Sequence, residues 1–421
     1  MKKHTPLYPA NIMLPDFSSV SGEKWAVIAC DQFTSEPEYW REAEKIVGDS
    51  PSTLSLIIPE VFLSETDSRI PAINETAKNY QNSVLNTHEN SMIYLERVQS
   101  DGRVRRGIVA MVDLEDYDFS KTSTSLIRAT EGTVLSRIPP RVKVRKLASI
   151  ESPHVMVLID DPDKTVIERF ALKKQDMKKA YGFNLMLGGG RVDGYFIDSA
   201  DFEGIDSALS NLVTESANIA RYGKKVNPVL FAVGDGNHSL ATAKTIYEDL
   251  KKEIGDKALT HPARYALCEI VNLHDDALSF EPIYRVVFGA DEEKLLSALN
   301  NYAQNLKGEE EAQKTTIVTT KGESEFTFKS PEKQLTVGTL QDFLDKFVKE
   351  NEGVEVDYVH GEDSVREIVK KQGAIGFIFS GMEKSQLFKT VIFDGALPRK
   401  TFSMGHARDK RYYLECREIT E

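Results

Sequence analysis

Residues 229–239 read VLFAVGDGNHS, and this stretch decides which fold the chain is expected to adopt. Its first five residues are all apolar, which is typical of a short buried strand. Gly234 and Gly236 follow, and from Leu240 onward the apolar residues recur at helical spacing until Gly255. The stretch therefore predicts a strand, a glycine-containing turn and a helix in direct succession.

Helical and strand-like segments alternate along the rest of the chain, which predicts an α/β or α+β fold. After residue 290 the composition becomes acidic and polar. We therefore expect an N-terminal region, residues 1–290, and a smaller C-terminal α/β domain, residues 291–421. The predicted helices cover residues 35–48, 72–85, 205–221, 240–254, 291–306, 340–350 and 364–372. The predicted strands cover residues 25–30, 92–99, 104–112, 133–144, 155–159, 229–233, 265–273, 283–288, 355–359 and 375–380, with a hairpin over residues 315–329.

The composition excludes several classes of protein. Hydrophobic residues make up 41% of the 421 residues and charged residues 28%, so the chain can build a core and is not disordered. The formal net charge of −12, from 53 basic and 65 acidic residues, argues against a nucleic-acid-binding face. We expect no signal peptide and no membrane span, because no apolar run approaches roughly 20 residues. Three widely spaced cysteines favour a reducing cytoplasm.

The glycine turn has the features of an anion-binding site. The first turn of a helix leaves backbone N–H groups unpaired, and the helix dipole adds positive charge there. Gly234 and Gly236 would let the backbone approach a phosphate closely. His238 and Ser239 could donate to phosphate oxygens, and Lys244 adds a basic group further along the predicted helix.

Two interpretations of this turn stay open. Strand–glycine–helix turns are common in α/β proteins that bind no ligand there, and the stretch matches neither the Walker loop nor GxGxxG. If the turn is a site, Asp235 would repel a bare phosphate. Its carboxylate is better suited to a metal ion, a ribose hydroxyl or a substrate hydroxyl.

At these residues the chain resembles DUF1015, a family of unknown function. The family's hallmark, Asp-Gly-His-His-Arg after an apolar strand, stands here as Asp235-Gly236-Asn237-His238-Ser239. Further segments match the family in order along nearly the whole chain: Glu131-Gly132-Thr133, Arg141, Pro282-Ile283-Tyr284-Arg285 and Leu397-Pro398-Arg399-Lys400. Most members carry Pro-Tyr-Asp where this chain has Ala29-Cys30-Asp31-Gln32, so it resembles a divergent bacterial branch.

The hallmark loop is similar to the phosphate loop of the ParB/sulfiredoxin superfamily, which includes an ADP-dependent free serine kinase. This resemblance implies a ParB/sulfiredoxin-like core and phosphoryl transfer from ADP or ATP to a small hydroxylated metabolite, such as a free amino acid. Glu131 would be the base, His238 a donor to the phosphates, and Asp235 the ligand of Mg²⁺. The implied phosphate-binding residues are Gly234, Gly236, Asn237, Ser239 and Lys244. The candidate anion clamps are Arg128, Arg137, Arg141 and Arg285.

Two departures from the hallmark bear on this hypothesis. Ser239 replaces an arginine and Asn237 replaces a histidine, so the loop has lost a full positive charge. Either Lys244 or one of the arginines compensates, or the ligand is less highly charged. A nucleotide-sensing module without turnover, and hydrolysis of a phosphorylated or acyl compound, are the alternatives. The expected partner is a small-molecule ligand, and a homo-oligomer is left open.

Three other motifs have simpler interpretations. Residues 186–191, with three consecutive glycines, precede a strand-like run and predict a hairpin turn. Cys30 follows an apolar run without a neighbouring histidine, which favours a buried structural thiol over a nucleophile. The acidic turn at residues 160–163 is expected to be solvated rather than to hold a cation.

Overall fold

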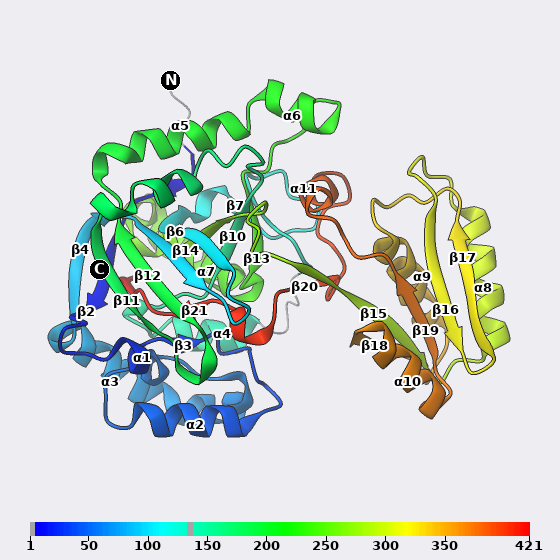
Figure 1. Ribbon diagram of the computed structural model, residues 1–421, viewed down its shortest axis with the longest axis horizontal. Coiled ribbons are helices and arrows are strands. Elements are labelled where there is room, and N and C mark those ends of the chain that lie inside the picture. The colour runs from blue at the N-terminus through cyan, green and yellow to red at the C-terminus, as the bar shows by residue number, and fades with distance from the viewer. Residues whose placement is uncertain (1–4, 133–137) are drawn as a thin grey trace. The chain divides into compact units, whose positions relative to one another are not determined.

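The computed structural model describes residues 5–132 and 138–421 (Figure 1), and their contacts group them into two compact units. Unit 1 comprises residues 5–129, 138–278 and 406–421, and unit 2 comprises residues 130–132 and 279–405. Residues 406–421, here called the C-terminal segment, thus return to unit 1. The domain division at residue 290 stays a prediction.

The main sheet of unit 1 has ten strands in the described part of the chain. Strand β13 lies between β10, to which it is antiparallel, and β8, to which it is parallel. Strand β14 lies on the other side of β10 and runs parallel to it. The order across the sheet is β11 (Lys178–Asn184), β12 (Arg191–Phe196), β5 (Ile93–Val98), β6 (Val104–Asp113), β14 (Tyr265–Asn272), β10 (Met156–Ile159), β13 (Phe231–Asp235), β8 (Ile127–Ala129) and β7 (Tyr117–Asp118), with β1 (Leu7–Tyr8) beside β6.

Both faces of this sheet are buried. Successive side chains of a strand point to opposite faces, and along β5 Tyr94 joins one hydrophobic cluster while Ile93 and Leu95 join the other. Figure 1 shows α5 and α6 on one side of the sheet and α1 to α3 on the other. The helices are α1 (Gly22–Trp25), α2 (Pro37–Val47), α3 (Thr66–Ser83), α4 (Ile138–Arg145), α5 (Phe202–Leu212), α6 (Glu215–Tyr222) and α7 (Asn237–Ile254).

Three small two-stranded sheets complete the strands described in unit 1. Two of them attach the C-terminal segment to earlier parts of the chain. The pairs are β2 (Ala10–Pro15) with β4 (Leu85–Ser91), β3 (Val27–Ile28) with β21 (Tyr412–Tyr413), and β9 (Ile150–Glu151) with β22 (Arg417–Glu418).

Unit 2 is a second α/β arrangement with its own core, in which Phe328, Phe377 and Leu340 are buried. Its described sheet has six strands in the order β17 (Gly322–Phe328), β16 (Gln313–Thr319), β19 (Ile375–Phe379), β15 (Phe280–Phe288) and β18 (Glu355–His360), with β20 (Phe402–Met404) beside β15. Its helices are α8 (Glu292–Asn305), α9 (Thr336–Glu350), α10 (Glu362–Gln372) and α11 (Lys384–Phe393). Among the residues described in either unit, none belongs to a helix long and apolar enough to cross a bilayer.

The predicted α/β fold is confirmed, and three of the predicted elements were wrong in part. Residues 138–145 form helix α4 rather than a strand, and residues 133–137 lie outside the described residues. The predicted strand over residues 25–30 is reduced to Val27–Ile28, because α1 extends to Trp25. The predicted helix over residues 205–221 is two helices, since the Thr214 side chain accepts from Ala217 N and begins α6.

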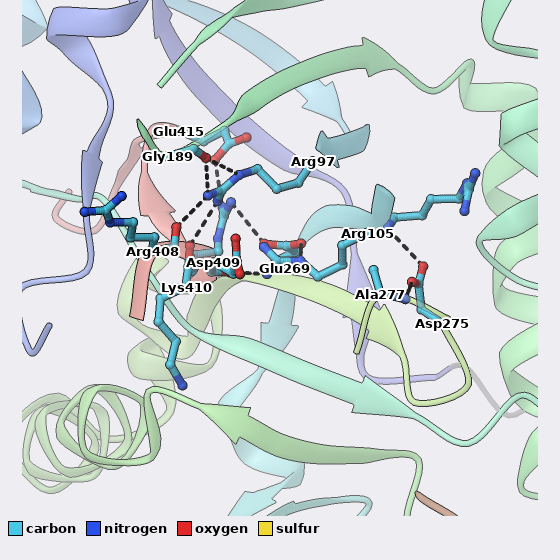
Figure 2. A network of polar contacts seen from close by, with 12 residues as sticks. Arg97, Arg105, Gly189, Glu269, Asp275, Ala277, Arg408, Asp409, Lys410 and Glu415 are labelled. Carbon is cyan, nitrogen blue, oxygen red and sulfur yellow. Dashed lines mark hydrogen bonds and ion pairs between the residues drawn. The ribbon is translucent and has the colours of Figure 1, made fainter. Parts of the chain in front are cut away.

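The C-terminal segment is held in unit 1 by a buried network of charged side chains (Figure 2). Glu269 on β14 is fully buried and pairs with Arg105 Nε and Arg411 Nη1, both at 3.3 Å. Arg411 also pairs with Glu415 at 2.7 Å. Arg97 on β5 donates to the carbonyl oxygens of residues 189, 408 and 410. These contacts satisfy charges that would otherwise be costly to bury.

The substitution Glu269→Gln is expected to lower the free energy of unfolding of unit 1 by roughly 3–5 kcal/mol, because it leaves buried guanidinium groups without their carboxylate. Urea unfolding followed by tryptophan fluorescence would measure it, since the chain's two tryptophans, Trp25 and Trp40, are both buried in unit 1. The control is Asp249→Asn, which breaks an exposed pair with Lys252 and should cost about 1 kcal/mol or less. If both substitutions lowered the free energy of unfolding equally, the network would not be a main source of stability in unit 1.

Candidate functional site

The glycine turn joins β13 directly to α7, as the sequence predicted. Gly236 is the N-cap of α7 and has a φ of +82°, in the left-handed region. A Cβ at this position would lie 3.0 Å from Val155 Cα, so both the backbone angle and the packing favour glycine. The first turn of α7 has neither an acidic residue nor a side-chain cap. Its positive dipole end is therefore suited to an anion.

Asp235 places a carboxylate at this turn, and the ammonium group of Lys410 lies beside it. Its Oδ1 accepts from Gly236 N at 2.9 Å, and its Oδ2 lies 3.6 Å from Lys410 Nζ. Both side chains are mostly buried. Figure 2 shows the Lys410 side chain extending away from the buried charge network. The structure thus places a cation at the loop that sequence reasoning missed, because Lys410 arrives only with the C-terminal segment.

A cavity of about 190 Å³, here called the α7 cavity, lies against the first turn of α7. Ser239, the third residue of the helix, lines it together with His154, and Ser239 Oγ lies 3.5 Å from His154 Nε2. His154 is near the turn because it precedes β10, whose Met156 is the register partner of Asp235. Much of the remaining wall is apolar and includes Leu56, Ile57, Ile58, Leu63, Val144, Ala148, Leu240 and Leu267.

Ion pairs form the charged edge of the α7 cavity. Arg141 on α4 pairs with Glu60, and Arg145 pairs with Glu151 at 2.6 Å. Glu151 also pairs with Arg417 at 2.8 Å. Burial would raise the pKa of Glu151, but Arg417 and Arg145 outweigh it and hold that pKa below its ordinary value. Among the charged side chains that line the cavity, Arg141 and Arg145 are thus balanced by Glu60 and Glu151.

The other residues predicted in the loop lie at the start of α7. Gly234 is in β13, and Asn237 begins the helix, with its Nδ2 donating to Val233 O at 3.4 Å. His238 is the second residue of α7, and its carbonyl accepts from Thr242 Oγ1 at 2.7 Å. Lys244 lies two turns into the helix. Its ammonium donates to Leu114 O at 2.8 Å and pairs with Glu248 at 2.6 Å.

The predicted base and clamp residues are distributed over both units. Arg128 on β8 is buried, donates to backbone carbonyls of residues 125, 227 and 228, and has its pKa lowered by burial. Arg285 belongs to unit 2, where it donates to Gln341 and to three carbonyl groups, and burial lowers its pKa to about 10. Glu131 also belongs to unit 2 and forms a β-bridge with Leu397. Arg137 lies outside the described residues.

The described residues include no set of side chains that would hold a magnesium ion by themselves. Within residues 5–132 and 138–421, no group of three or more His, Cys, Asp and Glu side chains is placed to hold a metal. Asp235 offers a single carboxylate with an ammonium group close to it, whereas Mg²⁺ requires near-octahedral oxygen ligation. Asp235 as a metal ligand stays a prediction, and no step below depends on it.

The family model "Protein of unknown function (DUF1015)" matches residues 16–347. The chain belongs to the DUF1015 family. The predicted membership is therefore confirmed. No curated protein matches the sequence.

Several solved structures are similar to this DUF1015 protein. A free serine kinase in complex with AMP is 10% identical, with 74% of this chain and 91% of that chain covered and a TM-score of 0.38. A conserved hypothetical protein from Pyrococcus furiosus is 10% identical, with 74% and 95% covered and a TM-score of 0.36. SbnI with a C-terminal truncation, from Staphylococcus aureus, is 11% identical, with 74% and 87% covered and a TM-score of 0.33.

Cys30 lines the α7 cavity, and its Sγ lies 2.9 Å from Tyr413 Oη. Cys30 is partly buried, and desolvation of its thiol raises the pKa to about 12, so the thiol is protonated at pH 8. We expect iodoacetamide to alkylate Cys30 at least ~100-fold more slowly in the native protein than in the urea-unfolded chain. Peptide mapping over time at pH 8 would measure both rates, and rapid native alkylation would contradict the structural role.

Proposed function

We propose that this protein binds a phosphorylated small molecule, with ADP or ATP as the working ligand, at the first turn of α7 and in the cavity beside it. The observation that carries the proposal is the position of the α7 cavity, which is lined by Ser239 and Leu240 of that turn. An anion placed there meets the positive end of the helix dipole.

Lys410 offers the positive charge that the family's loop arginine would otherwise supply. Its ammonium lies at Asp235, directly before α7, whereas the ammonium of Lys244 is engaged with Leu114 O and Glu248. A charge-assisted hydrogen bond contributes roughly 1.5–3 kcal/mol. Lys410 can therefore offset part of what the replacement of arginine by Ser239 removes, since its ammonium is shared with Asp235.

The apolar wall of the α7 cavity supports a ligand with a planar ring. An engineered apolar cavity of about 150 Å³ in another protein binds benzene. The α7 cavity, at about 190 Å³, is slightly larger and is similarly lined with aliphatic side chains. A nucleotide offers both parts that such a site requires, a flat base for the apolar wall and phosphates for the helix start.

For the reaction, we propose phosphoryl transfer to a small hydroxylated metabolite such as a free amino acid. Such transfer needs positioning, charge neutralisation and a base for the attacking hydroxyl. Glu131 keeps the role of base on the strength of the family resemblance. A sensing module without turnover is the second candidate, and the absence of an arginine from the loop favours it.

Nucleotide binding is expected to raise the melting temperature. At 100 times its Kd, ADP or ATP should add about 2.7 kcal/mol of stability. Lys410→Met should weaken binding roughly tenfold or more, because it removes the cation and leaves Asp235 beside the phosphates. The control is Lys251→Met near the end of α7; the Lys251 ammonium pairs with Glu115, so this substitution should leave affinity unchanged. If no nucleotide shifts the melting temperature, the nucleotide proposal is wrong.

Glu131→Gln should separate catalysis from binding. Loss of a general base typically costs 10²–10⁴-fold in rate, while the neutral amide keeps the side chain's size. We expect unchanged nucleotide affinity and a loss of nucleotide turnover with a panel of free hydroxy amino acids. Unchanged turnover would remove Glu131 from the base role. Nucleotide binding without turnover in the parent protein would favour the sensing module.

A further inference from the structure

Ser239 and His154 form a hydroxyl–imidazole pair inside the α7 cavity. Ser239 Oγ lies 3.5 Å from His154 Nε2, and both residues line the cavity wall. His154 is only 7% exposed, and its ring packs edge-on against Tyr413 with centroids 5.2 Å apart. A hydroxyl held beside a buried imidazole is the arrangement of an activated nucleophile, and such contacts are often longer before a ligand binds.

We propose that Ser239 is a phosphorylation site of this protein, with His154 as its base and the bound nucleotide as phosphoryl donor. The inference rests on the proposed nucleotide binding and deepens it, because it makes transfer a two-step reaction through a phosphoserine. The role is distinct from that of a hydrogen-bond donor to a phosphate, since a covalent bond forms at Oγ.

Bonds and protons balance in each of the two steps. In the first, Ser239 Oγ attacks the terminal phosphorus, an Oγ–P bond forms and the P–O bond to the rest of the nucleotide breaks. His154 Nε2 takes the hydroxyl proton, and the nucleotide leaves one phosphate shorter. In the second, the hydroxyl of the acceptor or of water attacks the same phosphorus and the Oγ–P bond breaks. His154 returns its proton to Oγ, and the proton of the attacking hydroxyl passes to Glu131, the base of the proposed function.

The surroundings of Ser239 stabilise the dianionic product. As the third residue of α7, Ser239 lies in the first turn, where the helix dipole favours negative charge. Arg141 and Arg145 line the same cavity. They are paired with Glu60 and Glu151, so the start of α7 is the main source of positive potential for the phosphate.

Ser207 gives a matched control outside the cavity. It is an exposed residue inside α5 and does not line the α7 cavity. The substitutions Ser239→Ala and Ser207→Ala remove the same hydroxyl group from two helices, and alanine is a favourable residue inside a helix.

The experiment incubates the full chain with ADP or ATP, with and without Mg²⁺, quenches single turnovers in acid, and measures intact mass and phosphopeptides. We expect one phosphoryl group on Ser239 in the parent and in Ser207→Ala, and none in Ser239→Ala at unchanged melting temperature. His154→Gln should slow labelling at least 100-fold while nucleotide affinity is kept.

Each other outcome overturns a definite statement. A nucleotide-induced rise in melting temperature without any phosphoserine overturns this inference and leaves nucleotide binding intact. Label on another residue, or label that persists in Ser239→Ala, overturns the assignment to Ser239. Unchanged labelling in His154→Gln removes His154 as the base. If no nucleotide shifts the melting temperature and none labels the chain, the proposed function and this inference fall together.

Discussion

Glu269 imposes the electrostatic constraint on which unit 1 depends. Its carboxylate is fully buried in the middle of the main sheet, where an unpaired charge would cost several kcal/mol. Arg105 supplies one partner from the neighbouring strand β6, but the other, Arg411, belongs to the C-terminal segment. The sheet is therefore fully stabilised only when the C-terminal segment, which follows unit 2 in the sequence, packs against it.

The same constraint positions the candidate site. In the sheet, Met156 of β10 is the register partner of both Glu269 on β14 and Asp235 on β13. Lys410 precedes Arg411 in extended backbone, where successive side chains point in opposite directions. Arg411 therefore reaches the buried network while Lys410 reaches the loop. The C-terminal segment thus pairs Arg411 with the buried Glu269 and also places Lys410 at the start of α7.

The parts of this fold that follow from local physics could be predicted from the sequence. The succession of β13, Gly236 and α7 is determined by an apolar run, a residue that tolerates positive φ and helical spacing. The hairpin of β5 and β6 likewise follows from alternating residues around a tight turn. Helix α4 could not be predicted in this way, because Val142 and Val144 alternate with basic residues as in a strand. Its two prolines, at positions 139 and 140, are accepted in the first turn of a helix.

The functional neighbours of the loop could not be predicted, because they depend on strand order. Nothing in the sequence near His154 indicates that β10 pairs with β13, and this pairing alone brings His154 to Ser239. Lys410 is even further from the loop along the sequence. The lysine that lies beside the loop stands at a position to which no motif points. The fold can thus bring a cation to a loop whose hallmark arginine has been replaced. In this protein the exchange has a second consequence, since the residue that replaced arginine carries a hydroxyl group beside a buried imidazole.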